Sequence, residues 1–431
     1  MKITFIEPRS TGANVYSRIS IPLLGPLYLG TILKKRGHTV EIYKENIFIP
    51  DYSKLDSDII GISMLTSTAK RGYEIAKKFP KERVIMGGSH ASLMPEEAIK
   101  FARQVVIGEA DSVIADVIEG KNTSTFVQGS PIDNLDELPF PDFSLIKGAR
   151  LPLKITPIST SRGCPYNCNF CSVTKFFGRN YRFRSAQSVI SEIISNAGKF
   201  FFFCDDNFAA NTKRTKELLC LMIKNKIHQW SCQVRTDIAN DDELLWLMAK
   251  AGCRYVCVGF ESINQKTLLA YQKRQSVSQI KEAIRAFHKH RIKVHGMFVL
   301  GSDEDSEKTV WETLKFSLRQ KIDTIQFMIL TPLPGTEVYN FLEAQKRIFT
   351  KDWGLYDGHH VVFKPKRLTA KQLQTSVFRA YGKFYSLFRS LALFMKFHFR
   401  NALFRFMGYR LVKKWKRQNI NLPWLIPSSY Q

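Results

Sequence analysis

Three absences limit what this chain of 431 residues can be. All eight cysteines lie between Cys164 and Cys257, with none in the first 163 or the last 174 residues. Disulfides would be spread over the fold, whereas thiols confined to one region favour a metal or redox site. No apolar run reaches the roughly 18 residues of a spanning helix. The first residues lack the features of a signal peptide, so we expect a cytoplasmic protein with reduced thiols.

Acidic residues are missing from the end of the chain. From Gly358 to Gln431 there are fifteen lysines and arginines and no aspartate or glutamate. This segment therefore supplies fifteen of the 26 net positive charges, so the excess is a local feature. Hydrophobic residues make up 44% of the chain, which predicts a globular protein with real cores in roughly two to three domains.

The first 125 residues alternate short apolar segments with segments of helical spacing. The apolar segments are rich in Ile and Val and are expected to be buried parallel strands, at residues 2–8, 39–45, 58–64, 83–89 and 104–110. This alternation predicts a doubly wound, Rossmann-like α/β domain over residues 1–125, with ligands beyond the carboxyl ends of its strands. Gly87 and Gly88 end one such strand, where a turn or a ligand needs close backbone approach.

The rest of the chain predicts a second α/β unit. A stretch rich in Pro and Asp at residues 133–143 indicates a linker over residues 126–154. Six further apolar segments follow, each ahead of a helical pattern, at residues 154–160, 201–206, 230–236, 255–262, 294–301 and 324–331. They predict a partial (β/α)6 barrel over residues 155–350, with active residues at the carboxyl ends of its strands. Residues 351–431 are expected to form a helical extension.

The segment TSRGCPYNCNFCS places Cys164, Cys168 and Cys171 in a C-x3-C-x2-C pattern. Thiolates at this spacing on a loop after a strand can hold three irons of a four-iron cluster. A structural zinc site normally recruits four Cys or His ligands. The next cysteine is Cys204, 33 residues away, and the nearest downstream histidine is farther still. The pattern therefore favours an iron–sulfur cluster with one open iron over a zinc site.

This cysteine motif, with the segments FFFCDDNFAAN, GFES and MILTPLPGT, resembles the radical S-adenosylmethionine (SAM) superfamily. Within it, the match is to the branch with an amino-terminal cobalamin-binding domain, which includes anaerobic magnesium-protoporphyrin ester cyclases and hopanoid methylases. GGSHASLMPEEAI, VIGEAD and LDELPFPDF fit this branch too, so the resemblance covers about residues 1–345. It implies a [4Fe-4S] cluster on the three cysteines, SAM chelated to the open iron, and cobalamin in the first domain.

The resemblance also implies a reaction. One electron from the cluster cleaves SAM into methionine and a 5′-deoxyadenosyl radical, which abstracts an unactivated hydrogen. We therefore expect an enzyme that methylates or cyclises a carbon of an apolar lipid or tetrapyrrole-like substrate, with flavodoxin or ferredoxin as electron donor. The alternatives are a radical SAM modifier of RNA, a radical SAM enzyme that has lost cobalamin, and a cobalamin-sensing module without activity. The intact three-cysteine loop argues against the last.

Several side chains are candidates to bind SAM. Tyr166 and Phe170 stand in the cysteine loop, where the family packs aromatic rings against the adenine; shielding of the cluster is the alternative for both. Asp205 and Asp206 end a barrel strand, where carboxylates could bind the amino group or ribose of SAM. For Asp206 the competing interpretation is an acidic residue in the first turn of a helix.

Two later strands add three candidates. Gln233 and Arg235 share one face of their strand, and the guanidinium of Arg235 suits the SAM carboxylate. Glu261 in GFES is the corresponding candidate for the ribose or amino group. Four other cysteines are expected to be small core residues: Cys204, Cys232, Cys253 and Cys257.

The first domain departs from one known cobalamin pattern. Domains of the methionine synthase type carry D-x-H-x-x-G after the first strand, and the histidine ligates cobalt. Here the segment reads EPRSTG, with Glu7 and Arg9 at the acid and histidine positions and Gly12 retained. Arginine offers no lone pair, so it cannot ligate cobalt. Either cobalamin binds without a protein ligand or the domain has lost it.

If cobalamin binds, Arg9 beneath the metal would disfavour a water ligand and weaken axial donation. Further candidates to contact it lie in the segments GGSHAS and VIGEAD, namely Gly87, Gly88, Ser89 and Glu109.

Residues 383–417 are dense in Phe and Leu and are expected to be an amphipathic helix. A basic face opposite an aromatic-rich face is typical of a helix on an anionic membrane, here the inner face of the cell membrane. Packing of the apolar face on the barrel carries equal weight. RNA is the least favoured partner, because the aromatics do not form a stacking platform on a sheet. The cations of the basic face are Arg389, Lys396, Arg400, Arg410 and Lys414.

Overall fold

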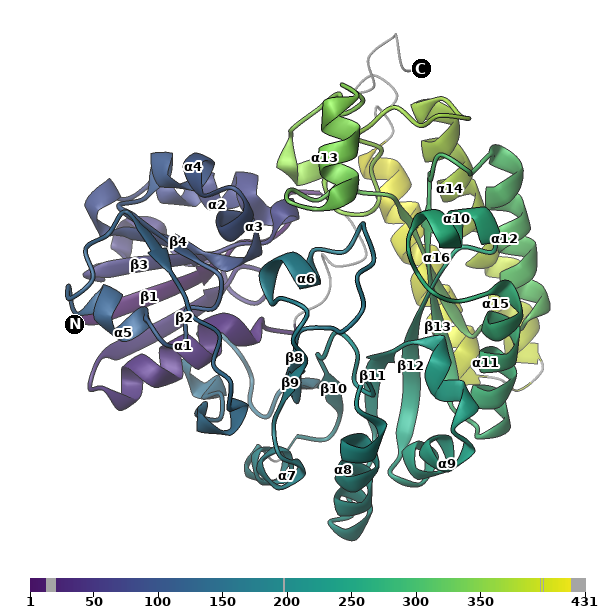
Figure 1. The fold of residues 1–431 in the computed structure, drawn as a ribbon, viewed down its shortest axis with the longest axis horizontal. Helices are drawn as coiled ribbons and strands as arrows, with labels where there is room; N and C mark the ends of the chain where they lie inside the picture. Colours follow the sequence, from purple (N-terminus) through teal and green to yellow (C-terminus); the bar gives the residue numbers. More distant parts are fainter. Residues whose placement is uncertain (13–20, 197, 396, 398, 420–431) are drawn as a thin grey trace.

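The computed structural model describes residues 1–12, 21–196, 198–395, 397 and 399–419. Two parallel six-stranded sheets lie side by side, the first with helices on both faces and the second with helices on its outer face (Figure 1). The expected α/β class, with a Rossmann-like unit followed by a partial barrel and C-terminal helices, is confirmed.

The first sheet contains all five expected strands. In sheet order its strands are β2 (Thr39–Lys44), β1 (Lys2–Glu7), β3 (Ile59–Ser63), β4 (Val84–Gly87), β5 (Gln104–Ile107) and β6 (Phe126–Gln128). Because β1 is followed by β2 on one side and β3 on the other, the strand order reverses beside β1. Ligands of doubly wound sheets bind in the crevice at this switch point. The sixth strand escaped detection because it has three residues and buries only Val127.

Helices cover both faces of this sheet: α1 (Leu24–Lys35), α2 (Ala69–Ala76), α3 (Gly88–Leu93), α4 (Pro95–Ala98) and α5 (Ile114–Ile118). The stretch expected to be a linker is folded onto the same sheet. Phe143, Leu145 and Ile146 join the core beside β1 and β2, and Ile146 forms a β-bridge with Ile42. These apolar side chains find a core there, which composition rich in Pro and Asp did not reveal.

The second sheet contains all six expected barrel strands. Its order is β14 (Thr324–Ile329), β13 (Lys293–Leu300), β12 (Cys253–Glu261), β11 (Trp230–Val234), β10 (Phe201–Phe203) and β7 (Thr156–Ile158). All five pairings are parallel. The sheet is open between β14 and β7, so the inner face of this partial barrel is reachable from one side.

Helices follow the strands on the outside: α7 (Ala186–Ser195), α8 (Thr212–Lys224), α9 (Asp242–Lys250), α10 (Gln265–Ala270), α11 (Val277–Lys289) and α12 (Glu307–Arg319). Their buried faces and the strands form one large core that includes Trp230, Phe287 and Phe327. Two short helices lie towards the first domain, α6 (Val173–Phe176) and α13 (Glu337–Ala344).

The C-terminal region is helical, as expected, but the helix expected over residues 383–417 is interrupted. Helix α14 (Ala370–Phe384) ends near the start of this range, and α15 (Leu387–Met395) and α16 (Phe399–Gln418) follow. Phe397, between the last two, has a φ of +59°, which no α-helix accommodates. Lys396 lies outside the described residues, as does the side chain of Arg400. The hydroxyls of Tyr381 and Tyr385 accept hydrogen bonds from the backbone of the edge strand β14, at Phe327 and Ile325, both at 2.8 Å. Helix α14 therefore satisfies an edge that would otherwise be unpaired.

A buried ion-pair network joins the two sheets. Arg162 binds Glu109 at 2.6 Å and Asp111 at 2.7 Å, and Arg182 also pairs with Glu109. A second junction runs through Trp353, whose indole N–H donates to Glu97 in α4 at 2.7 Å. The carboxyl ends of the two sets of strands are held facing one another by these contacts.

Candidate active site

The three clustered cysteines lie on a loop between β8 (Ser161–Arg162) and α6, at the carboxyl end of the barrel. Gly163 begins the loop with a φ of +85°, and a side chain there would meet the carbonyl oxygen of Asn180 at 2.5 Å. The backbone N–H of Cys171 donates to the carbonyl of Cys168 at 3.1 Å, which turns the chain between the last two thiols. All three cysteines are partly buried.

The donor set of this loop suits an iron–sulfur cluster. Burial raises the pKa of the Cys171 thiol to about 12, with further contributions from the charges of Cys168, Asp206 and Cys164, so the thiols are close neighbours. Within the described part of the chain, no three Cys, His, Asp or Glu side chains converge closely enough to hold a metal ion. A four-iron cluster takes each thiolate on a different iron, so its ligands need not converge on one ion. Three thiols on one short loop therefore fit the group by their chemistry.

The loop is fastened to the opposite wall of the barrel. The side-chain amide of Asn169 donates to the carbonyl of Ala270 at 2.7 Å, and the backbone carbonyl of Asn169 accepts from the backbone N–H of Val338 at 3.3 Å. Phe170 packs its ring against Tyr271, with centroids 4.9 Å apart. Phe170 is therefore held in a fixed position beside the cysteines.

Asp205 is used by the fold itself. Its carboxylate accepts hydrogen bonds from the backbone N–H and hydroxyl of Thr160, at 2.8 and 3.1 Å, and from the hydroxyl of Ser161 at 2.8 Å. It is almost completely buried. The structure thus places Asp205 as an anchor for the segment that leads into the cysteine loop, with its oxygens already engaged.

Asp206 has a different environment from its neighbour. Its side chain reaches solvent but is surrounded by protein on most sides, and this desolvation, together with the charge of Asp205, raises its pKa to about 7. It lies close enough to raise the pKa of the Cys164 and Cys171 thiols. Asp206 is therefore a carboxylate beside the cysteines with capacity to accept a hydrogen bond from a ligand.

The raised pKa of Asp206 gives a pH-dependent prediction. Below pH 7 the group is mostly protonated. The carboxylate formed as pH rises through 7 accepts a hydrogen bond from the SAM amino group better, so SAM, which is a cation at its sulfonium, should bind more tightly. We expect the affinity of the cluster-loaded protein for SAM to increase about tenfold from pH 6 to pH 8. Equilibrium dialysis measures this, and Asp206→Asn should remove the dependence. Equal affinities at both pH values would show that Asp206 does not contact SAM.

Tyr166 and Arg235 form one stacked unit at the mouth of the barrel. The guanidinium of Arg235 lies 3.6 Å from the centroid of the Tyr166 ring and donates to the carbonyl of Lys273 at 2.9 Å. The Tyr166 hydroxyl donates to Asp237 at 2.5 Å. Gln233 lies one step deeper on β11 and donates to the carbonyl of Asp205 at 3.4 Å. The Tyr166 ring is therefore fixed on one face by a cation.

Glu261 ends β12 in a left-handed backbone conformation, with a φ of +59°. A register shift between Gly259 and Glu261 marks a bulge at this point, and the carboxylate accepts from the ammonium of Lys273 at 2.7 Å in a buried pair. Gln275 donates to the carbonyl of Phe260 at 2.8 Å and so holds the bulge. Strained backbone of this kind is concentrated at functional sites.

Sequence reasoning missed three residues of this constellation, namely Asp237, Lys273 and Gln275. Asp237 follows β11 directly, so the rule that active residues follow barrel strands could have found it. The other two lie in the loop after α10, and no sequence pattern connects that loop with the end of β12.

A cavity of about 450 Å³ lies between the carboxyl ends of the two sheets. The first domain lines it with the ends of β1 and β3, including Pro8, Ser63 and Ser89. The barrel lines it with Phe170 of the cysteine loop and Met328 of β14. The candidate cofactor loop and the switch point of the Rossmann-like sheet therefore open into one space, called here the shared cavity.

The structure separates the residues expected to contact cobalamin. Ser89 lines the shared cavity, but Arg9 is exposed and does not; Pro8 and Ser10, on either side of it, do. Neighbouring side chains of an extended segment point in opposite directions, so the expected place of Arg9 beneath a bound corrinoid is not supported. Gly12 and Glu109 are also absent from the lining, Glu109 because it pairs with the barrel arginines.

Gly87 and Gly88 form a turn and do not line the shared cavity. Gly88 has a φ of +87°, and a side chain there would meet the carbonyl of Met64 at 2.7 Å. The close backbone approach that we expected here is therefore present. The group that approaches Gly88 is the backbone of Met64 and not a ligand.

One wall of the shared cavity carries a buried ion pair. Glu7 accepts from the ammonium of Lys44 at 2.9 Å and from the backbone of Leu23 at 3.2 Å, both through Oε2. Its Oε1 has no hydrogen-bond partner among the described residues. Burial raises the pKa of Glu7. Buried polar atoms are nearly always satisfied, so this oxygen suits a donor from a ligand.

Known proteins are similar in sequence to the chain that carries this site. A model of the radical SAM superfamily matches residues 158–317. Over 332 residues the chain is 30% identical to bacteriochlorophyllide d C-12(1)-methyltransferase of Chlorobaculum tepidum, which covers 73% of this chain and 72% of that protein. The chain belongs to the radical SAM superfamily. A [4Fe-4S] cluster and SAM are the cofactors of this superfamily, so the chain is a radical SAM enzyme.

Two more similarities extend over most of this radical SAM enzyme. The anaerobic magnesium-protoporphyrin IX monomethyl ester cyclase of Cereibacter sphaeroides is 27% identical over 440 residues, covering 89% of this chain and 70% of that protein. The solved structure of the cobalamin-dependent SAM radical enzyme OxsB with aqua-cobalamin bound superposes with a TM-score of 0.69 at 16% identity. That match covers 98% of this chain and 75% of the other. The described part of the enzyme therefore has the fold of a cobalamin-dependent radical SAM enzyme.

Proposed function

We propose that this radical SAM enzyme binds cobalamin in the shared cavity and methylates an unactivated carbon of an apolar substrate. The observation that carries the proposal is that one cavity is lined by both the Rossmann switch point and the cysteine loop. Such a cavity would bring a corrinoid and SAM to face each other. The similarity to a bacteriochlorophyllide methyltransferase supports methyl transfer, and the similarity to a cyclase makes ring closure the second candidate.

The residues around the cysteines suit SAM in defined roles. Cys164, Cys168 and Cys171 would hold the cluster, which supplies the electron for cleavage of SAM when bound. Tyr166, fixed by Arg235, offers a ring face to the adenine. Asp206 would accept hydrogen bonds from the amino group of SAM.

Two predicted SAM contacts would act by positioning. Arg235 is committed to Tyr166 and to the Lys273 carbonyl, and Glu261 to Lys273. We propose that both hold the SAM pocket in shape. The buried Nε of Arg235, which has no hydrogen-bond partner among the described residues, remains available to donate to the ligand. The electron would come from a flavodoxin or ferredoxin, since the cluster must be reduced by one electron in each cycle.

The first domain fits a corrinoid without a protein ligand to cobalt. Its wall of the shared cavity offers the hydroxyl groups of Thr66, Ser67 and Ser89 and the unpartnered Oε1 of Glu7. These acceptors suit the amide N–H groups that surround a corrin ring. No histidine lines the cavity within the described part of the chain.

Cobalamin reconstituted into the protein should therefore be bound with its own base displaced and without a histidine nitrogen on cobalt. Electron paramagnetic resonance of the Co(II) form tests this, because a nitrogen ligand splits the cobalt lines. A spectrum without nitrogen coupling is expected. Coupling to a protein nitrogen would contradict the proposed site, and failure to bind any corrinoid would favour cobalamin-free radical chemistry.

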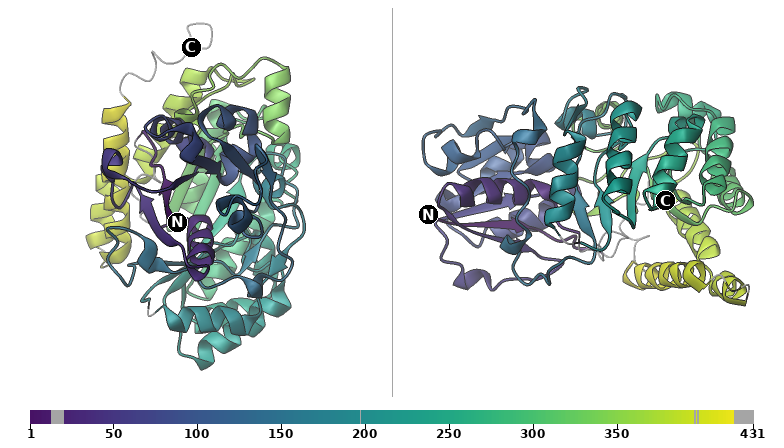
Figure 2. Two further views of the ribbon diagram at one scale, coloured as in Figure 1. Left: turned by 90° about the vertical axis from the view of Figure 1, so that its left-hand side faces the viewer. Right: turned by 90° about the horizontal axis from the view of Figure 1, so that it is seen from below.

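The C-terminal helices support peripheral attachment to an anionic membrane. No described helix is long and apolar enough to cross a membrane. Helices α15 and α16, coloured yellow, lie on the outside of the molecule (Figure 2). Phe388 and Met395 on α15 are 79% and 76% exposed, and Leu391 is also exposed. Phe384, the last residue of α14, is in contrast fully buried in the core.

The apolar residues of this segment thus divide into buried and exposed positions. Ala402, Val412 and Trp415 of α16 are buried, so this helix packs on the barrel. The exposed apolar side chains of α15 lie next to a basic segment without acids, which suits an anionic lipid surface.

Flotation with vesicles tests this attachment without damaging the core. Replacing Phe388, Leu391 and Met395 by serine should abolish co-flotation with phosphatidylglycerol vesicles, because these side chains would enter the lipid. Trp246→Ser, which alters an exposed aromatic residue on α9, should float like the wild type. Deletion of residues 380–431 would be a poor test, because it removes Tyr381 and Tyr385, whose hydroxyls accept hydrogen bonds from the edge strand β14. Unchanged flotation of the triple variant would contradict the attachment.

A further inference from the structure

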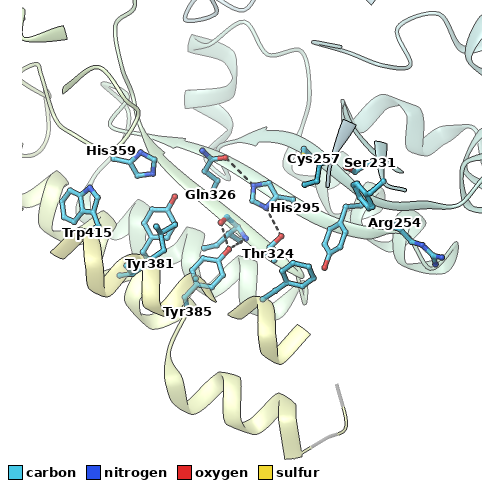
Figure 3. A pocket seen from close by; sticks show the side chains of 18 of the residues that line it. Ser231, Arg254, Cys257, His295, Thr324, Gln326, His359, Tyr381, Tyr385 and Trp415 are labelled. Atoms are coloured by element: carbon cyan, nitrogen blue, oxygen red, sulfur yellow. Dashed lines mark hydrogen bonds between the residues drawn. The ribbon is translucent and has the colours of Figure 1, made fainter. Parts of the chain in front are cut away.

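A second cavity, of about 750 Å³, lies between the inner face of the barrel sheet and the C-terminal helices (Figure 3). Ser231, Cys257 and His295 line it from neighbouring strands, while Tyr381 and Trp415 line it from α14 and α16. A cavity of about 300–1,000 Å³ is the usual size of a small-molecule site. We call this space the barrel cavity.

The barrel cavity and the shared cavity follow one another along the inside of the barrel. On β14, Thr324 and Gln326 line the barrel cavity and Met328 lines the shared cavity. Side chains two residues apart point to the same face of a strand, so these three form one continuous row. The segment after α13 repeats this order, since Gly358 lines the shared cavity and His359 the barrel cavity. The two cavities therefore lie end to end.

The lining of the barrel cavity is mostly aromatic and aliphatic. It includes Phe200, Ile325, Phe378, Phe404, Val412 and Trp415. Apart from Arg254 near the start of β12, the polar groups on its strands are neutral. Burial lowers the pKa of His295, so the imidazole is uncharged at neutral pH, and its Nδ1 lies 2.8 Å from the hydroxyl of Thr324. A charged group would be poorly accommodated in this interior.

Charge appears only at the edge of the barrel cavity. Among its described lining residues there is no Asp or Glu, and the charged ones are Lys154 and Arg254, both exposed. Arg254 lies at the outer end of the row of labelled side chains, away from the helices (Figure 3). An apolar interior with two cations at its edge is complementary to a long apolar molecule with one acidic end.

We propose that the barrel cavity binds a long hydrocarbon chain, fatty-acyl or prenyl, that ends in an acid group. The acid is held by Lys154 and Arg254, the chain fills the barrel cavity, and the apolar end points past Met328 into the shared cavity. This deepens the proposed function, because it names the apolar substrate class and places the reacting carbon far from the acid. The binding itself does not depend on cobalamin or on turnover.

Fluorescence of cis-parinaric acid, a polyunsaturated fatty acid, tests the proposal with the full-length, cluster-loaded protein. We expect saturable binding at one site per chain. Cys257→Phe fills the middle of the cavity and should weaken binding at least tenfold. Cys220→Phe, the same substitution at an exposed position on α8, should leave it unchanged. Equal binding by the two variants, or no saturable binding by the wild type, would overturn the assignment.

Two further measurements cover the acid group and the fold. Lys154→Gln with Arg254→Gln should weaken cis-parinaric acid about tenfold and leave its methyl ester unaffected. Equal effects on both would overturn the role of the cations. If Cys257→Phe does not fold, a diazirine-labelled palmitic acid cross-linked to the wild type should mark peptides of β14 and α16; marking elsewhere would contradict the site. Absence of SAM cleavage by the wild type would instead refute the proposed function, whatever the fatty acid does.

Discussion

Replacing Cys164, Cys168 and Cys171 together by alanine should abolish both the iron content and all cleavage of SAM. The three thiols lie on one loop, and the next cysteine along the chain, Cys204, is 33 residues away, directly after β10. Because each thiolate holds one iron, their loss leaves a cluster without protein ligands. We expect iron to fall from about four per chain to background, with no 5′-deoxyadenosine formed above the blank. Iron analysis and chromatography of the products measure the two effects.

A matched triple variant separates the cluster from general damage to the barrel. Cys220, Cys253 and Cys257 lie in the same domain, outside the loop. Their replacement by alanine should leave about four irons in place. Four irons retained by the loop variant, or equal loss from both triple variants, would show that the cluster lies elsewhere.

Arg162→Ala should destabilise the enzyme more than any surface substitution. Arg162 is 8% exposed and pairs with Glu109 and Asp111 from the opposite domain. Its removal leaves buried carboxylates with only Arg182 to compensate them, a change that typically costs about 3–5 kcal/mol. Since Arg162 stands two residues before Cys164, methyl transfer across the shared cavity should also be lost. Denaturant unfolding of the apoprotein measures the stability.

Arg36→Ala is the matched control for Arg162→Ala. Arg36 also binds a glutamate with two hydrogen bonds, to Glu119 at 2.7 and 2.9 Å, but at the surface. Exposed pairs contribute little, so this variant should unfold like the wild type. Similar unfolding of both variants would mean that the network between the domains does not hold them together.

The strands of both sheets could be predicted because each is a short run of apolar residues followed by a helical pattern. That pattern reports burial on two faces, and it located eleven of the twelve strands of the two large sheets. It failed for β6, which buries one side chain. It also failed for the C-terminal region, where a continuous apolar pattern hid two breaks between helices.

The site was predictable where one motif carries it and not where distant segments meet. The cysteine loop follows from spacing alone. The engagement of Asp205 by Thr160, and of Glu109 by Arg162, depends on contacts between residues about 50 positions apart. Sequence reasoning recognised these acids as unusual but could not tell an anchor from a ligand. The barrel cavity had no sequence signal, because it is formed by alternate residues of four strands and by α14 and α16.

We propose that SAM and a corrinoid face each other in the shared cavity. This arrangement is tested by incubating the anaerobically reconstituted enzyme, loaded with cluster and with cobalamin reduced chemically to Co(I), with SAM carrying a labelled methyl group. The reductant is required because only Co(I) supplies the electron pair that accepts a methyl group from a sulfonium. No substrate is needed, so the test does not depend on knowing the acceptor. We expect about one methyl label per chain to be recovered with the corrinoid, together with S-adenosylhomocysteine. Cleavage of SAM to 5′-deoxyadenosine with no label in the corrinoid would contradict it.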